Sequence, residues 1–374
     1  MEENRSAMSL DEQKESGATK GDEVVVGEAG RREENGKPAG LRHVLSFALR
    51  LLILGIVGFF FWVTLSKAWE QVVDSEVALD WRKVSWGMLA LSVPSVMAGL
   101  IPSCFAWQKI LDDFGQKIAW KKSFYAYFLG HFGKYVPGKA MAVILRVGAL
   151  HRHGVAVRPA VVSVFIETLT GIASGALLGA ILLQFTALPS SLRYVALACI
   201  PFAIVALLPH PFRWFVHRVA KSRIGKMPPK IADAINGRMM IRTVLTSILG
   251  WLLQGTALWL VLQALCLAVV DSVQGGAIAG GLPQVGTFQG WIVCVASMSL
   301  GAFVGFLSLL PGGAVARELA STWVLSSIVP QPIALLATVI VRLTSILAEM
   351  TMIFISWVVQ RSGTSEEVSK EEGK

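Results

Sequence analysis

The apolar segments of this chain constrain its fold more than any other feature. Several of them run for about 20 residues, which is the length that an α-helix needs to cross the hydrocarbon core of a bilayer. Charged residues make up only 16% of the sequence and apolar residues 54%, and the mean hydropathy is +0.59. A soluble chain normally has about a quarter of its residues charged. The sequence therefore predicts an all-α, polytopic helical membrane protein.

Composition divides the chain into three regions. Residues 1–42 are rich in Glu, Lys, Gly and Ser and contain no aromatic residue, a composition typical of disordered segments. They lack the short basic start and apolar core of a secretory signal, so we predict a disordered cytoplasmic tail. Residues 43–361 form a single predicted transmembrane domain. Residues 362–374 form a polar C-terminal tail.

Six segments are predicted to cross the membrane: residues 44–66, 86–110, 158–185, 193–208, 243–270 and 332–360. Between residues 109 and 122, after the second span, there are four lysines and two aspartates. Basic loops stay on the cytoplasmic side of a membrane. We therefore expect a multi-pass protein of the cell (cytoplasmic, or inner) membrane with both termini in the cytoplasm.

Two further apolar segments are interrupted by a Pro-Gly pair. Residues 124–150 are too short for two spans, break at Pro137-Gly138 and have basic flanks on both sides, which favours a re-entrant hairpin that opens to the cytoplasm. Residues 291–328 break at Pro311-Gly312-Gly313 and predict a second hairpin that opens to the outside. Its first arm, residues 291–310, is also long enough to cross. Crossing would place the C-terminus outside.

The two halves of the apolar region follow one order: a span, a broken hairpin and a span. Residues 86–185 form the first unit and residues 243–360 the second, in opposite predicted orientations. Inverted repeats with discontinuous helices are common in transporters, so we predict an inverted repeat. Chance periodicity is the alternative, because the halves share little sequence beyond the breaks.

Ionisable residues cluster around both breaks, and such residues at membrane depth indicate a functional site by default. The candidate substrate-binding residues are Lys134, Lys139, Arg146, Glu167, Arg317, Glu318, Arg342 and Glu349. Lys139 would begin the second arm of its hairpin, where the helix dipole also favours an anion such as a lipid phosphate. In the alternative interpretation, Lys134 and Lys139 extend to the cytoplasmic surface.

Some of these charges suit one another as partners. Arg146 is positioned to pair with Glu167, and Arg342 with a carboxylate on another helix. Arg342 and Glu349 share a helix face but lie about 10 Å apart along its axis, too far for a direct bond. The adjacent Arg317 and Glu318 point about 100° apart, so we expect them to have different partners. Structural ion pairs and substrate contacts are equally good interpretations at this stage.

The most basic segment of the chain runs from residue 210 to 242, with eight Lys or Arg and one acid. Phe212, Phe215, Val216 and Val219 share one helical face beside several basic residues. This pattern is typical of a helix that lies on an anionic membrane surface. A basic loop without lipid specificity is the alternative.

Motifs of the common enzyme classes do not occur. The sequence contains no HExxH, Walker loop or nucleophile elbow, so we expect no enzyme activity, no cofactor, no metal and no nucleic-acid partner. The four cysteines stand singly in apolar segments, as small core residues do; they are Cys104, Cys199, Cys266 and Cys294.

Three sequence elements together resemble one known family. GKYVPGK, followed by Arg146 and Glu167, and the later LLPGGAVARE and VIVRLTSILAE are similar to the membrane region of lysylphosphatidylglycerol synthetases. The resemblance covers residues 44–360. It departs at Val315, where the family usually has a glycine, and this bears on the flexibility of the second hairpin.

The resemblance implies a flippase-like protein, a stand-alone member without the aminoacyl-transferase domain. Such a protein would bind membrane lipids and move an anionic headgroup, of a phospholipid or a polyprenyl-phosphate-linked lipid, between leaflets. The alternative is a non-transporting accessory subunit that works with partner proteins of lipid-linked glycan or cell-envelope synthesis.

Overall fold

The structure, a computed structural model, describes residues 78–134, 140–223, 229–270, 282–308, 313 and 315–371, together with Trp62, Ser66 and Glu70. The predicted N-terminal tail and most of the first predicted span lie outside these residues.

The described chain is all-helical apart from one short strand pair, which confirms the predicted fold class. Its helices are α2 (Trp86–Asp113), α3 (Trp120–Gly133), α4 (Ala140–His151), α5 (Val157–Leu183), α6 (Ser190–Leu207), α7 (Pro209–Arg223), α8 (Pro229–Ala234), α9 (Gly237–Cys266), α10 (Leu282–Val285), α11 (Phe288–Leu307), α12 (Ala316–Leu325) and α13 (Gln331–Glu371). The strands β1 (Ala78–Leu79) and β2 (Val269–Val270) pair antiparallel and join the start of α2 to the end of α9.

Five described helices are long and apolar enough to cross a membrane: α2, α5, α9, α11 and α13. Helix α6 and the first part of α7 form a sixth if the bent pair is counted as one span. Four of the five correspond to predicted spans. The fifth, α11, is the segment for which both a crossing and a hairpin arm were open, and its length and composition alone leave both possible.

Local sequence sets the starts of two central helices. The side chain of Asn236 accepts a hydrogen bond from the backbone N–H of Met239, at 3.0 Å, and so caps α9. Thr287 caps α11 in the same way by accepting from the N–H of Gly290, at 3.3 Å. These caps satisfy N–H groups that a helix start leaves without an intrahelical partner.

The core forms where α2 and α9 cross, with α5, α11 and α13 packed around them. At the crossing the two backbones touch through glycines: a Cβ atom on Gly250 would lie 2.8 Å from the carbonyl oxygen of Gly99. Small residues at a helix crossing let backbones approach closely, a common device in membrane helix bundles. This crossing sets the frame on which the other helices pack.

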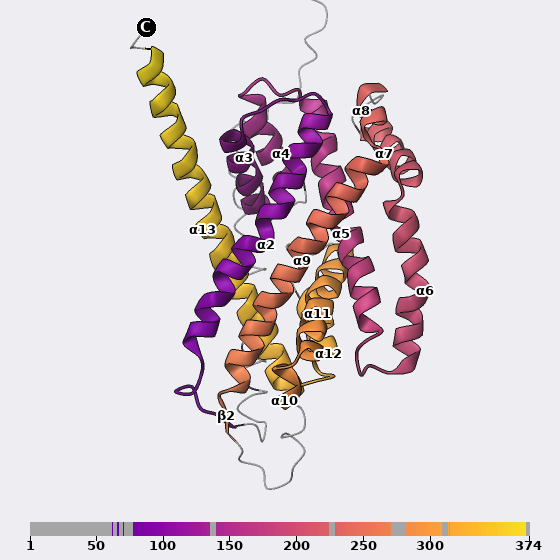
Figure 1. The fold of residues 1–374 in the computed structure, drawn as a ribbon, viewed down its shortest axis with the longest axis vertical. Helices are drawn as coiled ribbons and strands as arrows, with labels where there is room; N and C mark the ends of the chain where they lie inside the picture. The colour runs from indigo at the N-terminus through magenta and orange to yellow at the C-terminus, as the bar shows by residue number, and fades with distance from the viewer. Residues whose placement is uncertain are drawn as a thin grey trace, which may run out of the picture. The chain divides into compact units, whose positions relative to one another are not determined.

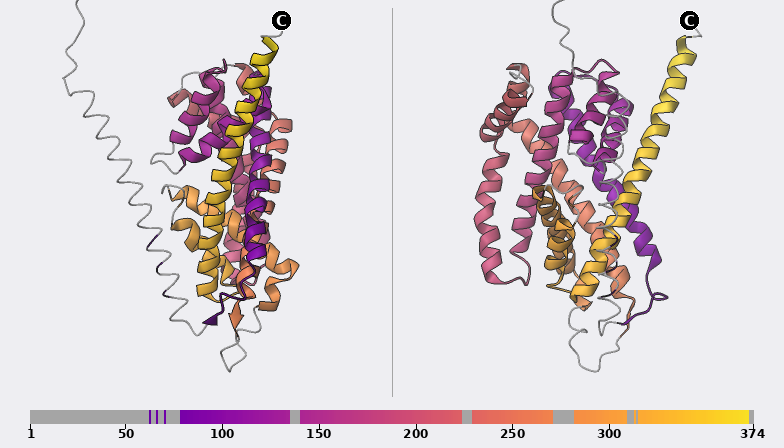
Figure 2. Two further views of the ribbon diagram at one scale, coloured as in Figure 1. Left: turned by 90° about the vertical axis from the view of Figure 1, so that its left-hand side faces the viewer. Right: turned by 180° about the vertical axis from the view of Figure 1, so that it is seen from behind.

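Two helix pairs lie in opposite halves of the bundle. Helices α3 and α4 pack side by side in the half where α2 ends and α5 begins, and α11 and α12 pack in the half where α9 ends and α13 begins (Figures 1 and 2). Each pair begins and ends at its own end of the bundle, as a hairpin does. We call these pairs the first and the second hairpin; the repeated order of span, hairpin and span and its inversion symmetry stay predictions.

Each hairpin has tightly packed arms. A Cβ on Gly133 would lie 2.6 Å from the Cα of Ala142, so the backbones of α3 and α4 touch close to the first break. In the second hairpin, the hydroxyl of Ser297 donates to the carbonyl of Ser321, and the Ser321 hydroxyl donates back to the carbonyl of Ser297, at 2.9 and 3.1 Å. The helical part of this second arm is shorter than predicted, ending at Leu325 rather than residue 328.

Candidate functional site

The first hairpin is joined to α5 by an ion pair. Arg146 on α4 donates through Nη1 to Oε2 of Glu167 on α5, at 2.8 Å, and both side chains are about nine-tenths buried. The hydroxyl of Tyr127 on α3 donates to the other carboxylate oxygen, at 3.2 Å. Both oxygens of Glu167 are therefore satisfied within the protein. The predicted Arg146–Glu167 pair is confirmed.

Aromatic rings complete the surroundings of Arg146. Its guanidinium carbon lies 4.1 Å from the ring centroid of Tyr127 and 5.2 Å from that of Trp107 on α2. The Trp107 ring is fixed by a hydrogen bond from its indole N–H to the hydroxyl of Ser163, at 3.0 Å. Aromatic faces stabilise a desolvated cation, so this arginine is held in place by a carboxylate and two rings.

The end of the first hairpin is joined to α13. The ammonium group of Lys134, which follows α3, forms an ion pair with Glu349, whose side chain is 5% exposed. Lys134 thus pairs with a residue of α13, although 37% of its side chain is exposed. Arg317 on α12 and Arg342 on α13 lie close enough to Lys134 to interact with its charge. The end of the first hairpin therefore lies near the second hairpin.

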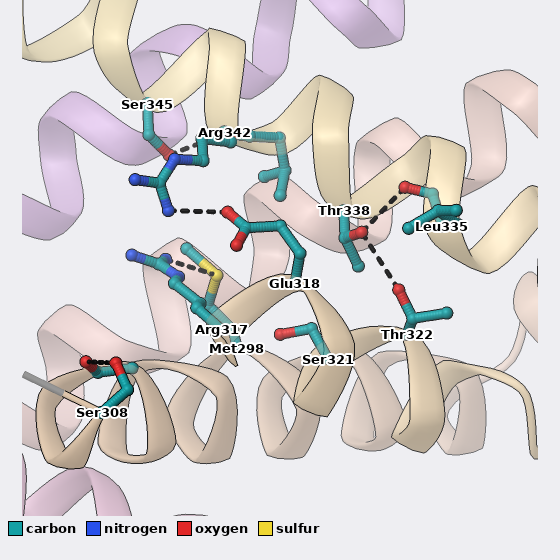
Figure 3. A network of polar contacts seen from close by, with 12 residues as sticks. Met298, Ser308, Arg317, Glu318, Ser321, Thr322, Leu335, Thr338, Arg342 and Ser345 are labelled. Carbon is teal, nitrogen blue, oxygen red and sulfur yellow. Dashed lines mark hydrogen bonds and ion pairs between the residues drawn. The ribbon is translucent and has the colours of Figure 1, made fainter. Parts of the chain in front are cut away.

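The second hairpin is joined to α13 by its own ion pair (Figure 3). Glu318 on α12 accepts through Oε1 from Nη1 of Arg342, at 2.6 Å, and both side chains are largely buried. One turn after Glu318 on α12 and one turn before Arg342 on α13, the hydroxyls of Thr322 and Thr338 lie 3.2 Å apart. Arg342 therefore pairs with a carboxylate on another helix, as predicted.

Arg317 and Glu318 have different partners, as their adjacent positions predicted. Nη2 of Arg317 lies 3.2 Å from the sulfur of Met298 on α11. Figure 3 shows the guanidinium groups of Arg317 and Arg342 pointing into the same region beside Glu318. The second carboxylate oxygen of Glu318 is buried and has no hydrogen-bond partner among the described residues.

Helix α13 connects the two hairpins. It carries Arg342, which pairs with the second hairpin, and Glu349, which pairs with the first. Seven residues separate them, or about 10 Å along the helix, which is why they pair with other helices rather than with each other. The four cations in this central region face three carboxylates, so its formal charge is +1; they are Lys134, Arg146, Arg317 and Arg342, with Glu167, Glu318 and Glu349.

Of the eight predicted residues, the structure describes all except Lys139. That lysine and Pro137-Gly138 lie outside the described residues, as does Pro311-Gly312 in the second break. A role for Lys139 in binding a phosphate stays a prediction.

Val315 has an unusual backbone conformation. Its φ of 68° and ψ of −55° make it the one positive-φ residue other than glycine in the described part of the chain. A β-branched residue is strained in this region, at a cost of about 1–3 kcal/mol. The residue lies directly before α12, at the position where a glycine was expected. The backbone is therefore strained at Val315, where α12 begins.

Three contact residues were not predicted from the sequence. Tyr127 lies four residues before His131 and seven before Lys134, so helical spacing on α3 could have placed it on the charged face. Trp107 contacts Arg146 from two helices earlier in the chain, and Met298 contacts Arg317 from the preceding helix. Their roles depend on tertiary packing and have no local signal.

One comparison with known proteins gives a match. The family model for the lysylphosphatidylglycerol synthase TM region matches residues 47–351. The matched segment includes both hairpins and all eight candidate residues. No curated protein matched the sequence.

Proposed function

Because the chain belongs to the lysylphosphatidylglycerol synthase membrane-region family, a group linked to lipid handling, we propose that it moves an anionic lipid headgroup between leaflets of the cell membrane. One observation carries this proposal. Two hairpins from opposite halves of the bundle carry charged residues, and both hairpins are joined by ion pairs to one long helix, α13.

The charge of this centre favours an anionic ligand. Buried cations are costly without a counter-charge, whether that charge is a fixed carboxylate or a bound anion. The described residues of this region include four cations and three carboxylates, and a net positive charge attracts an anion. Arginine suits a phosphate group because its guanidinium can donate two parallel hydrogen bonds, and Arg317 and Arg342 point into one region.

The ion pairs also suggest how binding could be coupled to movement. A phosphate that takes Lys134 from Glu349 would release the first hairpin from α13, and one that takes Arg342 from Glu318 would release the second. In this proposal the hairpins are re-entrant and open to opposite leaflets, the first toward the cytoplasm. A headgroup would then pass between Lys134, at the first hairpin, and Arg342, beside the second hairpin.

A second function is favoured by a specific observation. Each of the three central carboxylates already has a cation from another helix, as expected for a closed structural core. A non-transporting accessory subunit of lipid-linked glycan or cell-envelope synthesis would have this property. Such a protein would not move lipid on its own.

Replacement of the central arginines tests the proposal. We expect Arg146→Gln and Arg342→Gln to reduce the flipping of a fluorescent phosphatidylglycerol in proteoliposomes to the protein-free rate, while the folded protein remains recoverable. The matched control is Arg242→Gln. Arg242 pairs with Asp113 at 2.6 Å where α2 ends and α9 begins, takes no part in the central ion pairs, and should retain the wild-type rate.

The other outcomes are also informative. Loss of folded protein in both central variants, but not in Arg242→Gln, would show that these arginines are structural. Wild-type flipping in both would show that neither contacts the headgroup.

A further inference from the structure

Helix α7 lies across the end of the bundle. After Leu207 the chain bends by 71°, from α6 into the segment that begins with Pro209. Leu208 between them is extended, with φ −69° and ψ 140°, the conformation that a following proline favours. Because α6 runs along the long axis of the bundle (Figures 1 and 2), α7 turns away from that axis where α2 ends and α9 begins.

The rotation of α7 about its own axis is fixed by packing. Phe212 and Val216, one turn apart, are buried against residues from α2, α5, α8 and α9. Arg213 donates through Nη2 to the carbonyl of Ile235, at 2.9 Å, and ties the helix to the segment after α8. The faces that α7 presents outward are therefore set by the fold.

One of these outward flanks is apolar. Trp214 is 69% exposed and Phe215 45%, and Leu208 just before the helix is 47% exposed. At 100° per residue, Arg218 falls between Trp214 and Phe215 on this flank. His210 and His217 are also exposed, on the other side of Trp214 from Phe215, so the outward side of α7 carries two aromatic rings and the cation of Arg218 while its inner face is buried.

The surrounding surface is basic. The segment from residue 209 to 242 contains eight Lys or Arg and one acid. Arg218, Lys230 and Arg238 are all exposed there. A loop that only obeys the positive-inside rule requires neither a fixed helix nor exposed aromatic side chains. Helices that lie at a membrane interface carry exposed aromatic rings together with basic residues, because the rings enter the acyl-chain boundary while the cations bind headgroups.

We propose that α7 binds the anionic lipid surface of the leaflet at this end of the bundle. Trp214 and Phe215 insert at the acyl-chain boundary, and Arg218, Lys230 and Arg238 bind anionic headgroups. This interaction is separate from the central ion pairs and does not depend on lipid movement.

Quenching of a fluorophore by spin-labelled lipids tests this assignment on the full chain. The fluorophore is a bimane attached to the cysteine of the variant Phe215→Cys, Cys199→Ser. The protein is placed in phosphatidylcholine vesicles that contain one of two spin-labelled lipids, phosphatidylcholine or phosphatidylglycerol. Each of these lipids has its nitroxide near the headgroup end of the acyl chain. We expect both lipids to quench the probe, with phosphatidylglycerol the stronger. The stronger quenching by phosphatidylglycerol than by phosphatidylcholine should be lost in high salt and in the triple variant Arg218→Gln, Lys230→Gln, Arg238→Gln.

A second labelling site provides the control. Cys199 is exposed in the middle of α6, away from α7, so bimane on this native cysteine should be quenched equally by the two lipids. Retained quenching of the Phe215→Cys probe by phosphatidylcholine shows that the triple variant keeps α7 in place. Equal quenching by both lipids at position 215 in the unneutralised protein would overturn the anionic preference. Absence of quenching by either would show that α7 does not lie at the membrane interface.

Discussion

Arg146 and Glu167 contribute unequally to the stability of their buried pair. An arginine keeps its proton under all conditions that proteins experience, whereas a glutamate can take up a proton and become neutral. Loss of Glu167 therefore leaves an uncompensated cation against α5. Loss of Arg146 leaves a carboxyl group that still accepts a hydrogen bond from Tyr127.

Glu167→Gln should thus destabilise the protein more than Arg146→Gln does. We expect the first to lower the free energy of unfolding by about 3–5 kcal/mol, the usual cost of breaking a buried pair, and the second by clearly less. Denaturant unfolding in detergent measures both. Asp113→Asn, which breaks a partly exposed pair, should cost no more than about 1 kcal/mol. If Glu167→Gln cost no more than this control, the buried pair would contribute little.

At the scale of elements, the close contact between hairpin arms carries a second prediction. A Cβ at position 133 would lie 2.6 Å from the backbone of Ala142, so Gly133→Ala must push α3 and α4 apart. We expect a loss of about 1–3 kcal/mol, as for other overpacked sites, seen as a lower melting temperature in detergent. Gly148→Ala is the matched control, since a Cβ there meets nothing within 4 Å. Equal melting temperatures for the two variants would contradict the close packing of the arms.

The helices and the ion pairs differ in how far the sequence could predict them. Apolar length predicts α2, α5, α9 and α13, because a helix that crosses a bilayer must be apolar throughout. Length cannot decide whether α11 crosses, because that depends on where α12 leads the chain. The pairing of Arg146 with Glu167 could be predicted because the two residues have opposite charges within apolar segments. The partner of Lys134 lies 215 residues away in the sequence and could be identified only from the fold. Val315 stands where the family usually has a glycine, but its positive φ could be found only in the folded structure.

For the whole molecule, the distribution of charge predicts orientation. Exposed basic residues gather at the end of the bundle where α2 ends and α5 begins, which the positive-inside rule places in the cytoplasm; they include Lys117, Lys121, Arg152, Arg158 and Arg218. The turn between α5 and α6 lies at the other end (Figure 1).

Labelling of single cysteines in intact cells tests this orientation. In a Cys199→Ser background, a membrane-impermeant maleimide should label Ala187→Cys, which is exposed between α5 and α6, and should not label Arg152→Cys until the cells are opened. A C-terminal reporter should be active only in the cytoplasm. Labelling of Arg152→Cys from outside would reverse the orientation, and an external C-terminus would contradict the proposal that α11 and α12 form a re-entrant hairpin.

The most direct test of the central claim is leaflet-resolved lipid movement by the purified wild-type protein. Proteoliposomes with fluorescent phosphatidylglycerol or phosphatidylcholine in both leaflets are treated with dithionite, which bleaches only the outer leaflet. The account predicts that the protein makes the protected inner pool of phosphatidylglycerol accessible faster than protein-free vesicles do, and faster than it does for phosphatidylcholine. An inner pool that stays protected for both lipids, with folded protein in the membrane, would contradict the account and favour the accessory function.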